Sequence, residues 1–257
     1  MYKGIKDQSL VIYLKPRPSA PIRLFCLPYA GGGAHIFRKW SDAFPGNIEV
    51  CPLELPGRGR RIAEPLINNM ELLVEEIAGH LVSHLDKPFC FFGHSMGALI
   101  SYELTRYLKK IHKVSPVHLF ASAHPAPGVL KKEPVMHTLP DKEFIVKLEK
   151  MNGMPGEVLN NRELMEIMLP ILRSDFRVCE TYSPKENFLT DCPITVFGGL
   201  NDSSINQKDL IAWKNYTSST NKLHMLPGDH FFLYQQEKYI ISTICNDIMS
   251  HAFVRYK

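Results

Sequence analysis

The residues best suited to chemistry lie in the segment FFGHSMGA, from Phe91 to Ala98. Its centre fits the pattern G-x-S-x-G, which holds a nucleophilic serine on a strained turn between a strand and a helix. The context fits as well, because an apolar run precedes the turn and the helix-forming run ALISYELTRYL follows it. A side chain at Gly93 or Gly97 should collide with neighbouring backbone, which explains both glycines. The pattern predicts Ser95 as a nucleophile; the alternative is a glycine-rich turn with an incidental serine.

A serine hydroxyl is a weak nucleophile and needs a base within hydrogen-bond reach, which an acid in turn orients. With this turn the chain order is serine, acid, histidine. His230 fits the base, because it lies in PGDHFFL, a loop between the last predicted strand and the last predicted helix. His224 alternates within the strand and His251 lies near the chain end, so we expect structural roles for both. His94 is adjacent to Ser95 and should point elsewhere, which favours a packing role.

The acid should lie in the loop after the preceding strand. The run ITVFGG leads into Leu200-Asn201-Asp202, so Asp202 is the predicted acid. Its role would be to fix the tautomer of His230 and stabilise the imidazolium. Asp229 is interpreted as a turn residue, and Asp175, in a helical insertion, is a distant alternative acid.

A tetrahedral intermediate also needs backbone donors for its oxyanion. One should be the N–H of Met96, which follows the nucleophile, and the other should come from the loop after an early strand. The segment Leu27–Ala34, LPYAGGGA, supplies that loop. Ala30 or Gly31 would donate, and we favour Ala30. The alternative is a plain glycine-rich turn, while a phosphate-binding loop is disfavoured because no G-K-[ST] follows.

The elements that must position these residues are short apolar runs alternating with helical patterns. The predicted strands are Ile22–Leu27, Ile48–Leu53, Phe89–Phe92, Val117–Ser122, Ile194–Gly198 and the weaker Lys222–Leu226. The main helical patterns cover Asn69–Leu85, Met96–Leu108 and Tyr234–Phe253. Continuous apolar runs are typical of parallel strands buried on both faces. The pattern predicts an α/β protein of the α/β-hydrolase fold, with a mostly parallel central sheet and helices on both faces.

One segment breaks the alternation. From about Pro125 to Asp191 no good strand is found, and helical patterns cover Asp141–Lys150 and Arg162–Tyr182 around a GMPGE stretch. We interpret residues 125–191 as a helical lid inserted into a single domain of residues 1–257. The alternative is a structural excursion that covers the edge of the sheet.

Composition sets broad limits. The chain has 257 residues, 45% of them hydrophobic and 22% charged, with a formal net charge of +4, which fits a globular protein rather than a nucleic-acid binder. The densest basic cluster is Arg58, Arg60 and Arg61, which we interpret as a solvated turn. None of the six cysteines forms a C-x-x-C pair, so zinc and redox motifs have no support. Without a signal-like apolar stretch or a run of about 18 apolar residues, we expect a cytoplasmic protein with free thiols and no membrane contact.

The motifs, taken together, resemble the type II thioesterases that accompany nonribosomal peptide and polyketide synthases, and the related medium-chain fatty-acyl thioesterases. The resemblance covers nearly the whole chain. It is carried, in chain order, by LPYAGGGAHIFRKW, LELPGRGRR, FFGHSMGA, LRSDFRVCETY, FGGLNDSS and PGDHFFL. Lipases and esterases share the serine turn but rarely the whole set.

The resemblance implies hydrolysis of thioesters on the phosphopantetheine arm of acyl or peptidyl carrier domains, clearing misprimed or stalled carriers. Ser95 would take the acyl group, His230 would move the proton and water would release the acid. The chain would need no cofactor of its own, and we expect a monomer. Lid motion would gate entry of the arm. One of Arg58, Arg60 and Arg61 could steer an acidic carrier.

Two other functions stay open. The first is a general carboxylesterase or medium-chain acyl thioesterase, because one fold hosts many chemistries. The second is a carrier-binding module whose serine, histidine and aspartate are idle.

Overall fold

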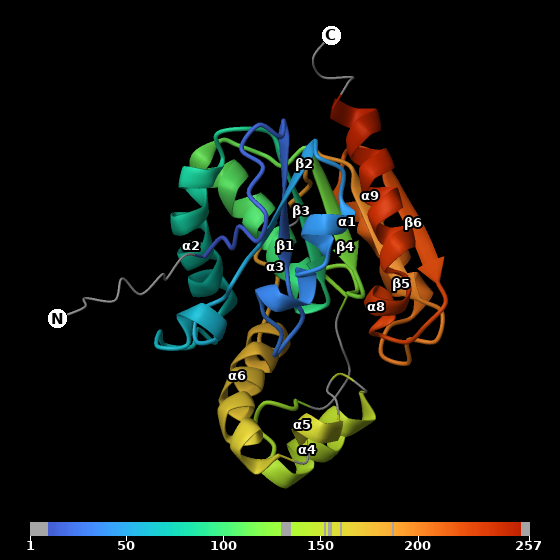
Figure 1. The fold of residues 1–257 in the computed structure, drawn as a ribbon. Helices are drawn as coiled ribbons and strands as arrows, with labels where there is room; N and C mark the ends of the chain where they lie inside the picture. The colour runs from blue at the N-terminus through green and yellow to red at the C-terminus, as the bar shows by residue number, and fades with distance from the viewer. Residues whose placement is uncertain are drawn as a thin grey trace, which may run out of the picture.

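The computed structural model describes residues 10–129, 135–151, 153, 156–159, 161–186 and 188–252. Its centre is one sheet of six strands in the order β2-β1-β3-β4-β5-β6 (Figure 1). The strands are β1 (Ile22–Leu27), β2 (Ile48–Pro52), β3 (Phe89–His94), β4 (His118–Ser122), β5 (Ile194–Gly199) and β6 (Asn221–Leu226). Every neighbouring pair is parallel. The predicted α/β class and parallel sheet are therefore confirmed.

Burial explains why the strands could be found from apolar runs. All residues of β1 to β5 are buried, whereas β6 at the edge of the sheet is buried only at its last residue. This difference matches the weaker pattern over Lys222–Leu226. Strand β3 runs two residues further than predicted, because Gly93 and His94 still pair with β4. That extension carries the chain directly to Ser95.

Helices cover both faces of the sheet (Figure 1). Their bounds are α1 (Trp40–Ala43), α2 (Met70–Leu81), α3 (Met96–Tyr107), α4 (Asp141–Lys150), α5 (Gly156–Leu159), α6 (Arg162–Glu180), α7 (Gln207–Ile211), α8 (Phe232–Gln235) and α9 (Glu237–Ala252). Helix α2 begins after Asn69, whose side chain accepts the N–H groups of Glu71 and Leu72 as an N-cap. It ends at Leu81 and continues as a 3-10 turn to His84, shorter than the predicted Asn69–Leu85.

The predicted terminal helix Tyr234–Phe253 is wrong in one respect. The chain forms two helices, α8 and α9, separated by Gln236, and Phe253 lies outside the described residues. The isoleucine stripe of α9 that the pattern identified is buried as expected. A break of one residue cannot be read from periodicity, because the apolar spacing continues across it.

Between β4 and β5 the described residues form helices α4, α5 and α6 and no strand of the sheet. We call these three helices and the described residues between them the helical lobe, and the sheet with its other helices the sheet body. Figure 1 shows the helical lobe projecting beyond the sheet, with α6 running back toward it. The lobe has a small core of its own around Phe144, Leu148 and Leu172. Residues 130–134, within the predicted insertion, lie outside the described residues, as do residues 1–9.

The sequence also predicts no membrane contact and cysteines outside any disulfide. In the described ranges, no helix combines the length and the apolar character needed to cross a bilayer. None of the six cysteines, all of which lie in the described residues, is part of a disulfide, and four of them are buried.

Candidate active site

Ser95 lies on the turn between β3 and α3 in a backbone conformation that few residues adopt. Its φ is 53° and its ψ is −119°, and its N–H donates to the carbonyl of Ser122 over 2.7 Å. A Cβ at Gly93 would lie 2.1 Å from the carbonyl oxygen of Gly97, and one at Gly97 would lie 2.3 Å from that of Leu27. The expected collisions with backbone are confirmed, so the two glycines permit the strained turn that exposes Ser95.

A continuous hydrogen-bonded chain joins the three residues predicted for catalysis. Ser95 Oγ lies 3.0 Å from Nε2 of His230, and Nδ1 of His230 lies 2.7 Å from Oδ2 of Asp202. The arrangement requires His230 to carry its proton on Nδ1, so that Nε2 can accept the serine proton. Serine, base and acid therefore stand in the order that activates a hydroxyl for attack on a carbonyl carbon.

The loops that carry the acid and the base are packed directly on each other. The N–H of Leu200 donates to the carbonyl of Leu226 over 2.8 Å, and the N–H of Asn201 donates to that of Gly228 over 2.9 Å. A Cβ at Gly199 would lie 2.4 Å from the carbonyl oxygen of Asp229. This close contact follows from the parallel pairing of β5 with β6, which brings both carboxyl ends to one edge of the sheet.

The Asp202 carboxyl is held in its charged form. Burial raises the pKa of this carboxyl, but the hydrogen bond and charge of His230 and the hydrogen bonds from Ser204 outweigh burial, so that the pKa lies below its usual value. Ser204 donates to Asp202 Oδ1 through its hydroxyl over 2.6 Å and its N–H over 2.9 Å. Ser204 was not predicted; an Asp whose side chain bonds two residues ahead is a recognisable Asx turn, and that signal was available.

His94 braces the base rather than acting as one. Its side chain is fully buried; Nε2 donates to the carbonyl of His230 over 2.9 Å, and Nδ1 accepts from the Ser122 hydroxyl over 2.9 Å. Burial, together with the nearby charge of His230, lowers the pKa of His94 to about 3. His94 is therefore neutral at neutral pH, in keeping with the expected packing role.

The loop predicted to hold the oxyanion is a tight turn. The N–H of Gly32 donates to the carbonyl of Tyr29 over 2.9 Å, and Gly31 has a φ of 78°. The N–H of Gly31 donates to Oδ2 of Asp175 over 2.7 Å, so it is already engaged. Of the two donors considered for this loop, the structure thus favours Ala30. Met96, the other predicted donor, is the first residue of α3.

The interpretation of the arginine cluster as a solvated turn is wrong. Arg58 is 6% exposed and forms two hydrogen bonds to Asp175, of 2.7 and 2.8 Å. Arg61 is 1% exposed and pairs with Glu64 and Glu76. Of the three arginines only Arg60 is exposed. A guanidinium can be buried when carboxylates match its planar donors. The partner of Arg58 is 117 residues away in the sequence, whereas Glu64 lies only three residues after Arg61. Asp175 serves Arg58 and Gly31 and does not reach His230 as an alternative acid.

The remaining predicted roles are simpler. Asp229 accepts the N–H of Phe231 over 2.9 Å, as a turn residue should. His224 contacts the Tyr239 hydroxyl over 3.1 Å.

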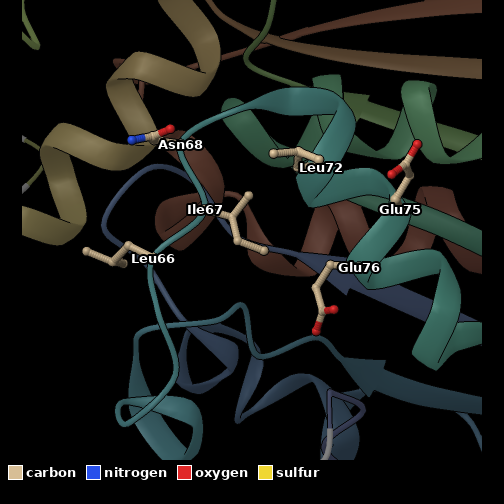
Figure 2. A pocket seen from close by; sticks show the side chains of 6 residues that line it. All are labelled: Leu66, Ile67, Asn68, Leu72, Glu75 and Glu76. Carbon is tan, nitrogen blue, oxygen red and sulfur yellow. The ribbon is translucent and has the colours of Figure 1, made fainter.

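Figure 2 shows a pocket between the segment 66–68 and α2, and its lining residues include none of the hydrogen-bonded chain at Ser95. Over the part of the chain that the structure describes, no group of three or more histidine, cysteine or acidic residues is placed to hold a metal ion.

Several known proteins are similar to this chain in sequence and in fold. The thioesterase domain family matches residues 22–248. The gramicidin S biosynthesis protein GrsT of Aneurinibacillus migulanus is 46% identical over 230 residues, covering 90% of each chain. The medium-chain S-acyl fatty acid synthase thioesterase of Homo sapiens is 35% identical over 237 residues, covering 90% of this chain and 88% of its own. The crystal structure of ClbQ from the colibactin NRPS/PKS pathway superposes with a TM-score of 0.86 at 34% identity, covering 91% of this chain and 99% of its own.

Proposed function

The chain belongs to the thioesterase family, and from that premise we propose that it is an editing thioesterase that clears acyl groups from carrier domains. Its substrates are thioesters on the phosphopantetheine arm of acyl or peptidyl carrier domains in nonribosomal peptide or polyketide synthesis. The single observation that carries the chemistry is the chain Ser95–His230–Asp202, with distances of 3.0 and 2.7 Å.

The reaction follows from that geometry. Nε2 of His230 takes the hydroxyl proton while Ser95 Oγ attacks the thioester carbonyl, and the N–H groups of Met96 and Ala30 bind the resulting oxyanion. The C–S bond then breaks, the thiolate takes the proton from His230, and the acyl group remains on Ser95. Water, deprotonated by His230, then attacks the acyl carbonyl; the ester bond to Ser95 Oγ breaks, His230 returns its proton to that oxygen and the free acid leaves. Asp202 holds the tautomer of His230 and stabilises its charged form throughout.

The carrier assignment rests on what similar proteins do. GrsT is named for gramicidin S biosynthesis, and ClbQ comes from an NRPS/PKS pathway, the setting that the sequence motifs also indicate. The substrate brings the phosphopantetheine, so the chain needs no cofactor of its own. The proposal includes a cytoplasmic monomer formed by one domain.

The helical lobe acts as the lid in this proposal. It lies at the carboxyl ends of the strands, where Ser95 and His230 stand (Figure 1). Leu172 of α6 contacts Gly31 in the predicted oxyanion turn, and Gly153 lies against the ring of Phe231, next to His230. A segment that contacts both sides of the site can control entry of a long, narrow arm.

A second candidate is a general carboxylesterase or a medium-chain acyl thioesterase on the same fold. The 35% identity to the human medium-chain enzyme is the observation that favours this second function. It shares the whole mechanism above, so only the choice of substrate separates the two functions.

The deciding experiment presents one short acyl group in three forms: on a holo carrier protein, on pantetheine and as an oxygen ester. The wild type and Ser95→Ala are assayed together. We expect the carrier thioester to have the highest kcat/KM and the variant to be inactive on all three. Equal or better turnover of the oxygen ester would refute the carrier proposal, and an active Ser95→Ala would refute the mechanism.

A further inference from the structure

A buried ion pair outside the hydrogen-bonded chain at Ser95 links the helical lobe to the predicted oxyanion turn. Asp175, in the C-terminal half of α6, is 1% exposed, and Arg58, in the loop after β2, is 6% exposed. Two parallel hydrogen bonds of 2.7 and 2.8 Å join the guanidinium to the carboxylate. The mechanism above uses neither residue, although burying both charges is costly unless their geometry is good.

The pair also holds the oxyanion turn from two sides. Oδ2 of Asp175 accepts the N–H of Gly31 over 2.7 Å, and Nη1 of Arg58 donates to the carbonyl of Gly32 over 3.1 Å. Both contacts fall on the turn Tyr29–Gly32, which carries Ala30.

A four-residue turn of this kind can adopt one of two related backbone conformations, type I or type II. With a hydrogen bond from Gly32 N to Tyr29 O and a Gly31 φ of 78°, it matches a type II turn. Types I and II differ by a flip of the central peptide, here the one between Ala30 and Gly31. The carboxylate of Asp175 binds the N–H of that peptide and so selects one orientation. A flip would change ψ of Ala30 and φ of Gly31 and would turn the carbonyl of Ala30 toward the Asp175 carboxylate, so the carboxylate holds the observed form of the turn that carries the Ala30 N–H.

Charge explains why Arg58 must accompany Asp175. A lone carboxylate beside the oxyanion turn would oppose the negative charge that develops on the substrate. The bidentate guanidinium compensates that charge while leaving the oxygens of Asp175 able to accept the Gly31 N–H.

We propose that Asp175 and Arg58 are positioning residues that fix the conformation of the oxyanion turn. Because Asp175 lies on α6, that conformation depends on the position of α6. The inference rests on the proposed function, in which Ala30 is an oxyanion donor. A side chain of α6 also touches the turn, since a Cβ at Gly31 would lie 2.5 Å from Leu172 Cδ2. When α6 packs against the turn, Asp175 and Leu172 contact it and it holds the conformation that binds the oxyanion. When α6 moves away, the turn loses both contacts.

The test is Asp175→Asn, which keeps an oxygen acceptor but removes the charge that pairs with Arg58. Turnover of an acyl-pantetheine is measured, together with inhibition by an acyl trifluoromethyl ketone, which adds to Ser95 and places an oxyanion in the hole. We expect kcat to fall about 100-fold with KM changed less than about threefold, because a misplaced donor weakens binding of the transition state and not of the substrate. The affinity for the ketone should fall by the same factor as kcat/KM.

The matched control is Glu49→Gln. Glu49 and Arg23 also form a buried pair, with an Nε–Oε2 distance of 2.9 Å, but at the amino ends of β1 and β2. This variant should lower the melting temperature as Asp175→Asn does, while kcat stays within about threefold of wild type, because the pair lies at the end of the sheet remote from Ser95.

Conservative variants separate positioning from folding. Asp175→Glu and Arg58→Lys keep both charges, and we expect each to lie between wild type and Asp175→Asn in kcat and in ketone affinity. If Asp175→Asn does not fold, these two variants decide by the same measurements. The inference is overturned if kcat falls no more than in Glu49→Gln, or if kcat falls while ketone affinity is unchanged. Repeating the series on the oxygen ester keeps this test valid if the carrier proposal fails.

Discussion

The sheet body and the helical lobe are built on different scales. In the sheet body, buried side chains from both faces of the sheet form one continuous core that includes every residue of β1 except Arg23 and the first four residues of β3. In the helical lobe, the core is a small cluster centred on Phe144 and Leu172, surrounded by partly buried neighbours. Because apolar burial is the main favourable term in folding, the lobe has far less to hold it together.

Polar contacts hold the lobe where apolar contacts are few. Glu180 accepts the N–H groups of Met136 and His137, and Arg173 pairs with Asp141 and lies over the ring of Phe144. Segments with few buried contacts open locally at low cost, whereas a large core opens only when the whole domain unfolds. The difference suits a rigid body that holds the reacting groups and a lobe that opens, as the proposed lid would.

The largest effect should come from removing the nucleophile of the sheet body. Ser95→Ala should lower kcat at least about 10⁴-fold, because no other group can form the acyl-enzyme. The melting temperature should stay within a few degrees of wild type, since the side chain is only partly buried. Turnover and thermal unfolding are measured on the same preparation. Turnover above about one hundredth of wild type would contradict the assignment of the chemistry to this residue.

The two cores can be compared by matched truncations. Phe91→Ala in β3 should lower the free energy of global unfolding by about 3–5 kcal/mol, the usual range for a buried phenylalanine. Phe144→Ala in α4 removes an equally buried ring, since both side chains are 0% exposed. It should instead raise amide exchange across the lobe with a smaller change in global stability. Equal losses of global stability would show that lobe and body unfold as one unit.

Glycine substitutions sharpen the comparison further. A Cβ at Gly93 would lie 2.1 Å from backbone of the serine turn, whereas one at Gly153 would lie 2.7 Å from the ring of Phe231. The backbone next to Gly93 cannot move away from an added Cβ, whereas the ring of Phe231 can shift when the segment around Gly153 is loosely held. Gly93→Ala should therefore cost about 3 kcal/mol in chemical denaturation and Gly153→Ala less than about 1 kcal/mol. A larger cost at Gly153 would mean that the lobe is held as rigidly as the body.

The smallest effect at neutral pH concerns the histidine buried in the body. The pKa of His94 in the folded chain is about 3, below its usual 6.5, so between these values the unfolded chain binds a proton that the folded chain does not. The stability of the sheet body should therefore be complete above pH 6.5 and fall as the pH drops toward 3. His94→Gln should remove about 1.4 kcal/mol per pH unit from that slope. Denaturation series from pH 4 to 7 measure both slopes; identical slopes would contradict the neutral, buried state of His94.

Much of the fold was readable because its signals are local. Strands β1 to β5 are largely apolar runs, and their observed ends differ from the predicted ones by at most two residues. Strand β6 was the weakest prediction for the same reason, since only its last residue is buried. Leu72 shows the limit of the method: it is one of the apolar residues of the helical pattern Asn69–Leu85, as are Leu73 and Ile77. Leu73 and Ile77 are buried, whereas Leu72 is 59% exposed because it lies outside the buried face of α2.

What the sequence by itself determined is the chemistry of the site. The turn around Ser95 requires two glycines that are close in the chain, and Asp202 and His230 stand at the ends of consecutive strands. These features follow from steric exclusion and chain order, so they are visible without coordinates.

Only the tertiary structure decided how that chemistry is supported. Arg58 and Asp175 are 117 residues apart, and no periodicity or motif in either segment indicates the other. The same holds for His94 and the carbonyl of His230, which are 136 residues apart. A buried charge or ring nitrogen takes whichever partner folding brings within hydrogen-bond distance, and that distance is a property of the packed chain and not of any segment.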